Sequence, residues 1–546
     1  MPRLVPALFG ALTLALQTAA AHAAPPPAHA EPHKPDPAEP TKAFFEPTEI
    51  RSTGSVTVGG NPIAYDAIAG TLVVHAKEWS DTDSTEALAI GTKTPEDSEK
   101  DKGPKPEASV YFTAYFKQGV PAASRPITFL FNGGPGSSSV WLHMGAFGPL
   151  RVLTADHAPT APAPYKVVNN DQSLLDASDL VFIDAPGTGF SRIAGKDKAK
   201  AFYGVDQDIA AFADFIGQFL SRYGRWNSPK YVFGESYGTM RGAGLALALQ
   251  EKDIDLNGLI LLSDILNWDL TPDDPQTNPS VDLPYIVSLP TYAATAWYHG
   301  RVPTNGTLRS FLDRVEAYAT GDYALALLKG STLPDVERQR VAQQLSAFSR
   351  LPVSYLLKTN LRIEYGAFQK ELLADRGITT GTLDTRFAGA TLDPLSKVAE
   401  WDPQSRAISG AYISAFNDYA RSRLHYGAGI EFKPGIPIYS DWDYKHAPPG
   451  SRKPLIALPN VLPDPAATMK QNPTLKVMVN GGYFDVSTPY FAGVYELRHL
   501  PIPASLTGNI VYHYYESGHM VYALPPALKA FHDNVAAFIA NSSAGR

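Results

Sequence analysis

The residues Gly-Glu-Ser-Tyr-Gly at 234–238 indicate chemistry more directly than any other part of this sequence. A short apolar run precedes them at 231–233, and an Ala- and Leu-rich stretch follows at 243–249. A serine with glycines two positions away on either side, between a strand and a helix, is typical of a nucleophile elbow. The turn strains the serine backbone, and the glycines let strand and helix approach closely. We therefore expect Ser236 to stand exposed at the carboxyl edge of a parallel sheet; the alternative is an ordinary turn serine.

A hydroxyl nucleophile needs a base to accept its proton and a third group to orient that base. In sheet hydrolases the chain order is serine, then acid, then histidine. Asp485 follows a predicted strand at 475–480, and His519 lies just beyond the next predicted strand at 510–515. This order predicts that Ser236, Asp485 and His519 converge. The alternative for His519 is a loop histidine with no catalytic role.

A glycine-rich stretch, Asn-Gly-Gly-Pro-Gly-Ser-Ser-Ser at 132–139, directly follows a predicted strand at 127–131. A turn of this kind can aim backbone N–H groups at an oxygen that gains negative charge during a reaction. A phosphate-binding loop is the competing interpretation. It is rejected because the lysine of G-x-x-x-x-G-K is missing.

The elements that would position these residues alternate between strands and helices. Short apolar runs suited to strands buried on both faces occur at 110–116, 127–131, 180–184, 231–234 and 259–262. Apolar residues between them recur at helical spacing, which is typical of core packing: Ile209, Phe212, Ile216, Phe219 and Tyr223. The alternation predicts an α/β fold with a mostly parallel sheet covered by helices.

The flanking segments follow other patterns. β-branched runs at 55–58, 63–69 and 71–76, broken by glycines, predict an antiparallel meander. Helical patterns dominate the region after 270, at 307–319, 334–349, 363–374 and 408–424, and a last helix begins at 525. We predict the following segments: a signal peptide at 1–23, a Pro-rich linker at 24–41, an N-terminal β-rich extension at 42–106, the α/β core at 107–270 and 466–546, and a helical lid or insertion at 271–465.

The first residues are typical of a secretory signal. Arg3 precedes a short apolar run at 4–16, and Ala-His-Ala at 21–23 offers a cleavage site. The apolar run is too short for a comfortable membrane span, so we expect no membrane anchor after cleavage. Export of a chain with no cysteine favours a bacterial periplasm or the medium.

Composition narrows the remaining classes. The net charge is −7 and no basic stripe occurs, which argues against a nucleic-acid partner. The absence of cysteine excludes thiol catalysis and cysteine-ligated metals. The histidines show no H-E-x-x-H or comparable spacing, so we expect neither a metal nor an organic cofactor.

Five blocks together resemble one family. They are Asn-Gly-Gly-Pro-Gly-Ser-Ser at 132–138, Asp-Ala-Pro-Gly-Thr-Gly-Phe-Ser at 184–191, Gly-Glu-Ser-Tyr-Gly at 234–238, Gly-Tyr-Phe-Asp at 482–485 and Gly-His-Met at 518–520. In this order they look like the serine carboxypeptidases, α/β-hydrolase-fold enzymes that remove C-terminal residues from peptides.

The resemblance implies a role for each matching residue. Ser236 would be the nucleophile, His519 the general base and Asp485 its partner. The backbone N–H groups of Gly134 and Tyr237 would form an oxyanion hole. The substrate's terminal carboxylate would bind at Asn132, Gly133 and Glu235. A carboxylate can bind beside Glu235 only if that side chain is protonated, which requires a raised pKa and favours acidic pH.

Three departures from the family pattern stand out. Leu130 replaces a usual Trp, Ser137 replaces a usual Cys, and Ala146 takes the place of a second Glu of the carboxylate site. The loss of the second acid predicts weaker selectivity for a free C-terminus. We expect an exported serine carboxypeptidase that acts on peptides through an acyl-enzyme. The alternatives are an esterase or acyltransferase on the same machinery, and a binding protein on an inactive hydrolase fold.

Overall fold

The computed structural model describes residues 44–77, 79, 105–272, 275–451 and 458–543. The predicted signal peptide and Pro-rich linker lie outside these residues. The described residues from 44 onward form one compact unit. Among the described helices, none has the length and apolar character that crossing a bilayer requires.

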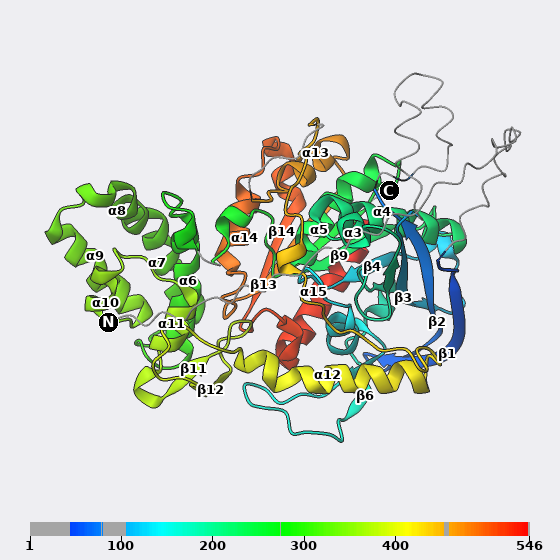
Figure 1. Ribbon diagram of the computed structural model, residues 1–546, viewed down its shortest axis with the longest axis horizontal. Coiled ribbons are helices and arrows are strands. Elements are labelled where there is room, and N and C mark those ends of the chain that lie inside the picture. Colours follow the sequence, from blue (N-terminus) through cyan, green and yellow to red (C-terminus); the bar gives the residue numbers. More distant parts are fainter. Residues whose placement is uncertain (1–43, 78, 80–104, 273–274, 452–457, 544–546) are drawn as a thin grey trace, which may run out of the picture. The chain divides into compact units, whose positions relative to one another are not determined.

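A mixed sheet of ten strands runs through the described part of this unit (Figure 1). Its order is β1-β2-β3-β7-β4-β9-β10-β13-β14, and β8 pairs with β3. From β7 to β14 all neighbours are parallel, whereas β1, β2 and β3 pair in antiparallel fashion. The strands are β1 (Thr48–Val58), β2 (Asn61–His75), β3 (Glu107–Lys117), β4 (Ile127–Phe131), β7 (Asp179–Ile183), β8 (Arg192–Ala194), β9 (Lys230–Glu235), β10 (Gly258–Leu262), β13 (Lys476–Gly482) and β14 (Ile510–Tyr515).

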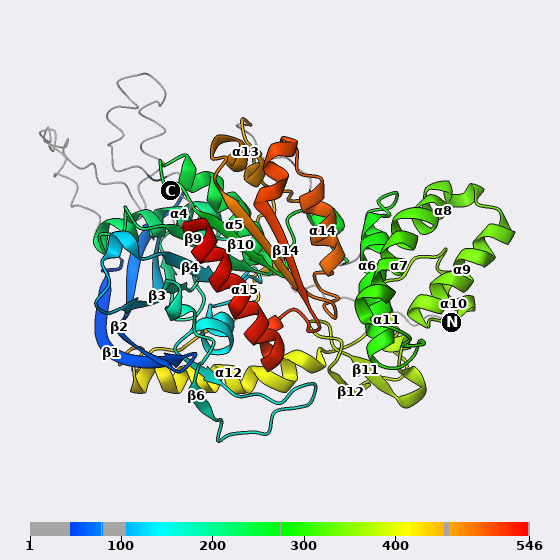
Figure 2. The ribbon, with the colours of Figure 1, turned by 180° about the vertical axis from the view of Figure 1, so that it is seen from behind.

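Side chains alternate between two hydrophobic layers, one on each face of the sheet. In β9, Tyr231 and Phe233 enter one layer and Val232 enters the other. This alternation follows from the two-residue repeat of a strand. Helices α4 (Val205–Arg222), α5 (Tyr237–Gln250) and α13 (Pro463–Gln471) contribute to the layer of Val232, whereas α12 (Pro403–Ser422) and α15 (Pro525–Ser543) contribute to the other (Figures 1 and 2).

The N-terminal strands extend the same sheet. The prediction of two strands at 63–69 and 71–76 is wrong, because β2 runs unbroken through Gly70. A Cβ at Gly70 would lie 2.2 Å from the Thr48 carbonyl oxygen of the paired strand β1. Glycine here therefore permits close strand approach, where the sequence pattern indicated a turn.

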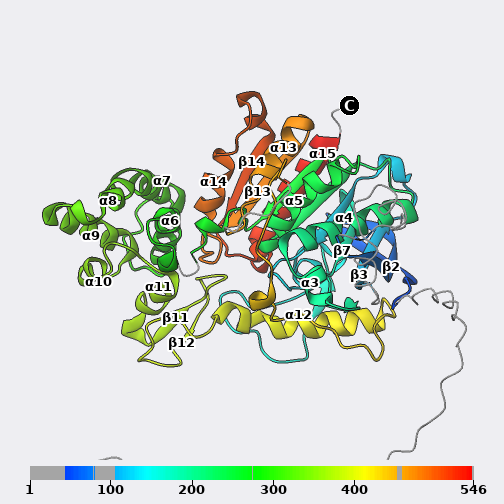
Figure 3. The same cartoon turned by 45° about the horizontal axis from the view of Figure 1, so that its top comes forward.

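The chain between β10 and β13 is mainly helical. It contains α6 (Leu283–Tyr298), α7 (Leu308–Tyr318), α8 (Ala324–Lys329), α9 (Asp335–Ser349), α10 (Val353–Lys358), α11 (Tyr365–Glu371), the hairpin β11 (Ile378–Thr380) and β12 (Ala388–Ala390), and then α12 and α13. Helices α6 to α11 gather in one lobe beside α14 (Tyr490–Arg498), and α12 runs back along the sheet domain (Figures 1 and 3). The sequence analysis did not predict helix α6, because Pro290 lies inside it and proline normally ends a helix.

The lobe packs around a third hydrophobic core, to which the sheet domain also contributes side chains. Val287 and Leu345 belong to this core together with Phe484 and Tyr490, which flank Asp485 in the segment after β13. Short segments complete the described elements: β5 (Leu150–Val152), β6 (Val167–Asn169) and α3 (Lys198–Phe202). The lobe thus rests directly on a loop that carries a predicted site residue.

A buried ion pair ties the layers together under the glycine-rich loop. Arg241 of α5 donates through Nε to Asp208 Oδ2 of α4 at 2.6 Å, and both side chains are fully enclosed. The same guanidinium donates through Nη1 to the Asn132 carbonyl oxygen at 2.8 Å. Because an unpartnered buried charge is costly, this pair fixes α4, α5 and the loop relative to one another.

Removing only one member of this pair should destabilise the fold strongly. We expect Arg241→Met to lower the free energy of unfolding by about 3–5 kcal/mol, because Asp208 is left buried without its partner. The double variant Asp208→Leu/Arg241→Met should recover much of that loss, since no buried charge remains. Urea unfolding of the two variants tests this. A double variant no more stable than the single one would contradict it.

Candidate active site

Ser236 occupies the junction between β9 and α5. Its backbone has φ 61° and ψ −133°, a positive-φ conformation that residues other than glycine rarely adopt. The Ser236 N–H donates to the Leu262 carbonyl oxygen at 2.9 Å. A Cβ on Gly234 would lie 2.0 Å from the Gly238 carbonyl oxygen. The two glycines therefore permit the sharp turn that strains Ser236, as expected for an elbow.

Asp485 and His519 form a buried pair in the loops after β13 and β14. His519 Nδ1 lies 2.7 Å from Asp485 Oδ2. The other Asp485 oxygen accepts from the N–H groups of Ser487 at 2.9 Å and Thr488 at 3.0 Å, and the Thr488 hydroxyl donates to Oδ2 at 2.7 Å. An ionised Asp485 fixes the histidine tautomer with Nδ1 protonated, which leaves the Nε2 lone pair available.

The histidine is also held through its backbone. The His519 N–H donates to the Leu383 carbonyl oxygen at 2.6 Å, and the His519 carbonyl oxygen accepts from Ser263 Oγ at 2.7 Å. Leu383 belongs to the segment between β11 and β12, and Ser263 directly follows β10. The imidazole is therefore positioned jointly by the sheet and by the inserted region.

Two opposing influences act on the pKa of His519. Burial lowers the pKa, but the charge of Asp485 and its hydrogen bond act in the opposite direction, and the pKa lies above its ordinary value. Glu235 adds to this rise. Loss of the Asp485 charge would therefore leave burial dominant.

The glycine-rich loop packs directly on the elbow. A Cβ on Gly133 would lie 2.4 Å from the Tyr237 backbone nitrogen, and Gly134 has φ +106°. The Tyr237 N–H belongs to the first turn of α5, where no intrahelical acceptor exists. The Tyr439 hydroxyl donates to the Gly134 carbonyl oxygen at 2.6 Å, which anchors the loop from the inserted region.

A cavity of about 280 Å³ unites most of the predicted site residues. Ser236 and His519 line it, as do Asn132, Gly133, Gly134 and Glu235. The region at 271–465 supplies the opposite wall: Leu383, Gln404, Ser405, Ile408, Ser409 and Tyr439. Asp485 lies behind His519, and the Tyr237 side chain is buried away from the cavity. The structure therefore brings six of the predicted residues to one cavity and joins Asp485 to it through His519, whereas Tyr237 does not line it.

Glu235 is a buried carboxyl group in the lining of the cavity. Only 2% of its surface is exposed, and the Tyr522 hydroxyl lies 3.0 Å from its Oε1 and 2.8 Å from its Oε2. Burial raises the pKa of Glu235 to about 7, although nearby His519 and the hydrogen bonds from Tyr522 and Asn132 oppose the rise. A carboxyl group in this setting can carry a proton near neutral pH.

Sequence reasoning missed two partners in this site. Thr488 touches both Asp485 and His519, with its hydroxyl 3.1 Å from His519 Nδ1, and Tyr522 touches Glu235. Thr488 lies three residues after Asp485, a spacing at which threonine often bonds locally and which could have signalled it. Tyr522 carried no such signal, because its contact depends on tertiary packing.

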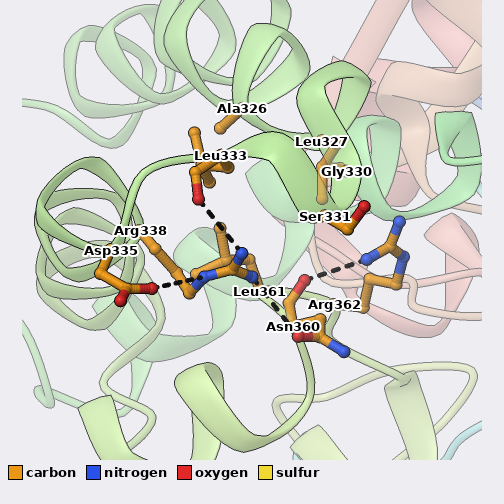
Figure 4. Close-up of a pocket in the computed structure, with 10 residues that line it drawn as sticks. All are labelled: Ala326, Leu327, Gly330, Ser331, Leu333, Asp335, Arg338, Asn360, Leu361 and Arg362. Atoms are coloured by element: carbon orange, nitrogen blue, oxygen red, sulfur yellow. Dashed lines mark hydrogen bonds and ion pairs between the residues drawn. The ribbon is translucent and has the colours of Figure 1, made fainter.

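A second cavity, of about 370 Å³, lies inside the helical lobe (Figure 4). Its two arginines are already engaged: Arg362 pairs with Asp282 at 2.7 Å, and Arg338 donates to the Asn360 side chain at 3.4 Å. The described residues that line it include no histidine. This cavity therefore offers no histidine to act as a base for its Ser331, and the cavity at Ser236, which His519 lines, is the stronger candidate.

The order of the parallel strands and the elbow are those of an α/β-hydrolase fold. Residues 101–266 match the family model described as serine carboxypeptidase. Pheromone-processing carboxypeptidase kex1 of Aspergillus niger is 25% identical over 169 residues, covering 31% of this chain and 25% of that protein. Human retinoid-inducible serine carboxypeptidase is 32% identical over 127 residues, covering 23% of this chain and 25% of that protein. The aligned part therefore spans about a quarter of each of these relatives.

A likeness to a solved structure extends over most of the chain. The prohormone-processing carboxypeptidase Kex1 of Saccharomyces cerevisiae superposes with a TM-score of 0.50 and 16% identity, covering 87% of this chain and 91% of that one. At this identity the likeness establishes the α/β-hydrolase fold.

The balance at His519 gives a direct test. We expect Asp485→Asn to move the pKa of His519 below its ordinary value of about 6.5, because burial remains while the opposing charge is lost. An NMR pH titration of the ring measures the shift. His532, whose raised pKa depends on its own partner Asp176, serves as the internal control. An unchanged pKa for His519 would contradict the balance described here.

Proposed function

We propose that this protein is a serine carboxypeptidase that removes C-terminal residues from peptides through an acyl-enzyme on Ser236. The single observation that carries the proposal is the placement of Ser236, the hydrogen-bonded His519–Asp485 pair and the buried Glu235 around one cavity. The match of residues 101–266 to the serine carboxypeptidase family model supports the same activity.

In the first half of the reaction Ser236 Oγ attacks the carbonyl carbon of the last peptide bond. His519 Nε2 accepts the hydroxyl proton, and the charge of Asp485 stabilises the resulting imidazolium. The N–H groups of Gly134 and Tyr237 donate to the oxyanion. The intermediate then collapses, His519 gives its proton to the leaving amine, and the acyl-enzyme remains. Water, deprotonated by His519, attacks this ester; the bond to Ser236 Oγ then breaks, His519 returns the proton to that oxygen, and the shortened peptide leaves.

The carboxylate of the substrate would bind beside the nucleophile. Asn132 and the Gly133 loop supply polar groups, and protonated Glu235 donates a hydrogen bond to the carboxylate. The productive state pairs protonated Glu235 with neutral His519. The alternative state, ionised Glu235 with His519 imidazolium, holds the same number of protons as the productive state. Because the carboxylate of the substrate repels ionised Glu235, its binding favours the productive state.

The remaining assignments belong to the same proposal. Residues 1–23 act as a signal peptide for export to the periplasm or medium, and the 271–465 region acts as a lid that helps to select the substrate. In support of the lid, Leu383, Tyr439 and residues of α12 line the same cavity as Ser236.

Loss of the nucleophile should abolish turnover. We expect Ser236→Ala to lower kcat on a blocked dipeptide by roughly 10⁶-fold, by analogy with the serine of subtilisin. His519→Ala should lose a comparable factor, because Ser236 then has no base. Ser409→Ala is the matched control, since this serine lines the same cavity on α12. Substantial turnover by purified, folded Ser236→Ala protein would refute the assignment.

The pH profile tests the role of Glu235. As pH rises through about 7, the pKa of Glu235, kcat/KM for peptides with a free C-terminus should fall, because the ionised side chain repels the substrate carboxylate. Amidated or ester substrates should escape this loss and follow His519 alone. Glu235→Gln keeps a donor without titrating, so it should flatten the upper limb of the peptide profile. Identical profiles for free and amidated peptides, unaltered by the substitution, would favour an esterase instead.

A further inference from the structure

Tyr522 is the residue whose hydroxyl is hydrogen-bonded to the buried Glu235 carboxyl group. We propose that the Tyr522 hydroxyl replaces a second acid in the carboxylate pocket, and that its hydrogen bond to Glu235 sets the pH above which a free C-terminus is rejected. The inference rests on the proposed function, because it assigns the specificity-determining contact of the same site.

The geometry of this contact is that of a built pair. Tyr522 belongs to the short helical turn η11 (Val521–Ala523), only three residues after His519, and its hydroxyl reaches both oxygens of Glu235. Both side chains are only 2% exposed. The contact is therefore sheltered from water, and its loss would not be compensated by solvent.

Small residues on a neighbouring turn leave room for this tyrosine. The turn η2 (Leu142–Phe147) packs against η11 and contains Gly145 and Ala146. A Cβ on Gly145 would lie 2.8 Å from Cδ2 of Tyr522 and 2.6 Å from the ring of Tyr412. The backbone of η2 is thus pressed against two tyrosine rings. Ala146, the position at which the family resemblance places a second Glu, brings no carboxyl group to Glu235.

A tyrosine and a carboxyl group differ in their effect on Glu235. Two neighbouring acids repel when both are ionised, so a pair of acids retains one shared proton to higher pH. Tyr522 carries no charge, because burial holds its pKa well above the ordinary value and the charge of Glu235 adds to the rise. Its hydroxyl therefore keeps a proton to donate to Glu235, and this hydrogen bond favours ionised Glu235 over the protonated form.

The other groups that face Glu235 act in known directions. His519 favours the ionised form, whereas Asp485 disfavours it. Tyr412 is buried nearby and feels the charge of Glu235, but no hydrogen bond joins the two among the described contacts. Removing the Tyr522 hydroxyl should therefore raise the proton affinity of Glu235 without changing any formal charge.

The test measures binding, so that it does not depend on turnover. In the Ser236→Ala background, calorimetry from pH 5 to 9 compares an N-acyl dipeptide with its C-terminal amide, with Tyr522 present or replaced in Tyr522→Phe. Affinity for the free acid should fall up to tenfold per pH unit above the midpoint, whereas the amide should vary little. Tyr522→Phe should move the midpoint upward by about one pH unit or more, because a hydrogen bond to the ionised form is lost.

Tyr412→Phe in the same background is the matched control and should leave the midpoint in place. An unshifted midpoint in folded Tyr522→Phe protein, or an equal shift in both variants, would overturn the inference. Equal affinity for acid and amide at every pH would also overturn it, while leaving a Ser236 hydrolase intact. Failure of the proposed catalysis would instead appear as inactivity of the protein that retains Ser236.

Discussion

The left-handed backbone of Ser236 is the constraint on which the site depends. It can persist only because Gly234 and Gly238 let β9 and α5 approach, while Leu262 of the neighbouring strand accepts the Ser236 N–H. The same turn brings the first amide of α5 against Gly133, so the loop after β4 must also follow the elbow closely. The buried Arg241–Asp208 pair then secures that loop from below. Strain at one residue is thus maintained by contacts from three parallel strands and two helices.

Burial and hydrogen-bond donors, more than the number of charges, set the electrostatics of the carboxyl groups around the cavity. Asp485 is enclosed, yet four donors stabilise its carboxylate, whereas Glu235 is enclosed with Tyr522 as its principal donor. This difference accounts for one acid that orients His519 and another whose pKa rises to about 7. Two carboxyl groups in one site therefore have different hydrogen-bond environments, and burial raises the pKa of Glu235.

The sequence predicted what depends on local pattern. The elbow, the glycine-rich loop, the strands that precede Asp485 and His519 and the helices α7, α9, α11 and α12 of the insertion follow from short-range signals, and the family resemblance added the predicted carboxylate site. Strand β2 was divided at Gly70 because close strand approach looks like a turn in sequence, and α6 was missed because Pro290 is tolerated inside it. The Tyr522 contact could not be predicted, since the pairing of residues 287 positions apart depends on how η11 packs. The roles of the site residues remain predictions.

Detection of a covalent intermediate tests the central claim most directly. The protein can be mixed with an activated ester of an N-acyl amino acid, quenched in acid within seconds, and examined by intact and peptide mass spectrometry. The account predicts a mass increase equal to the acyl group, confined to the peptide that contains Ser236. Hydrolysis of the ester without any such adduct, or an adduct on another residue, would contradict it.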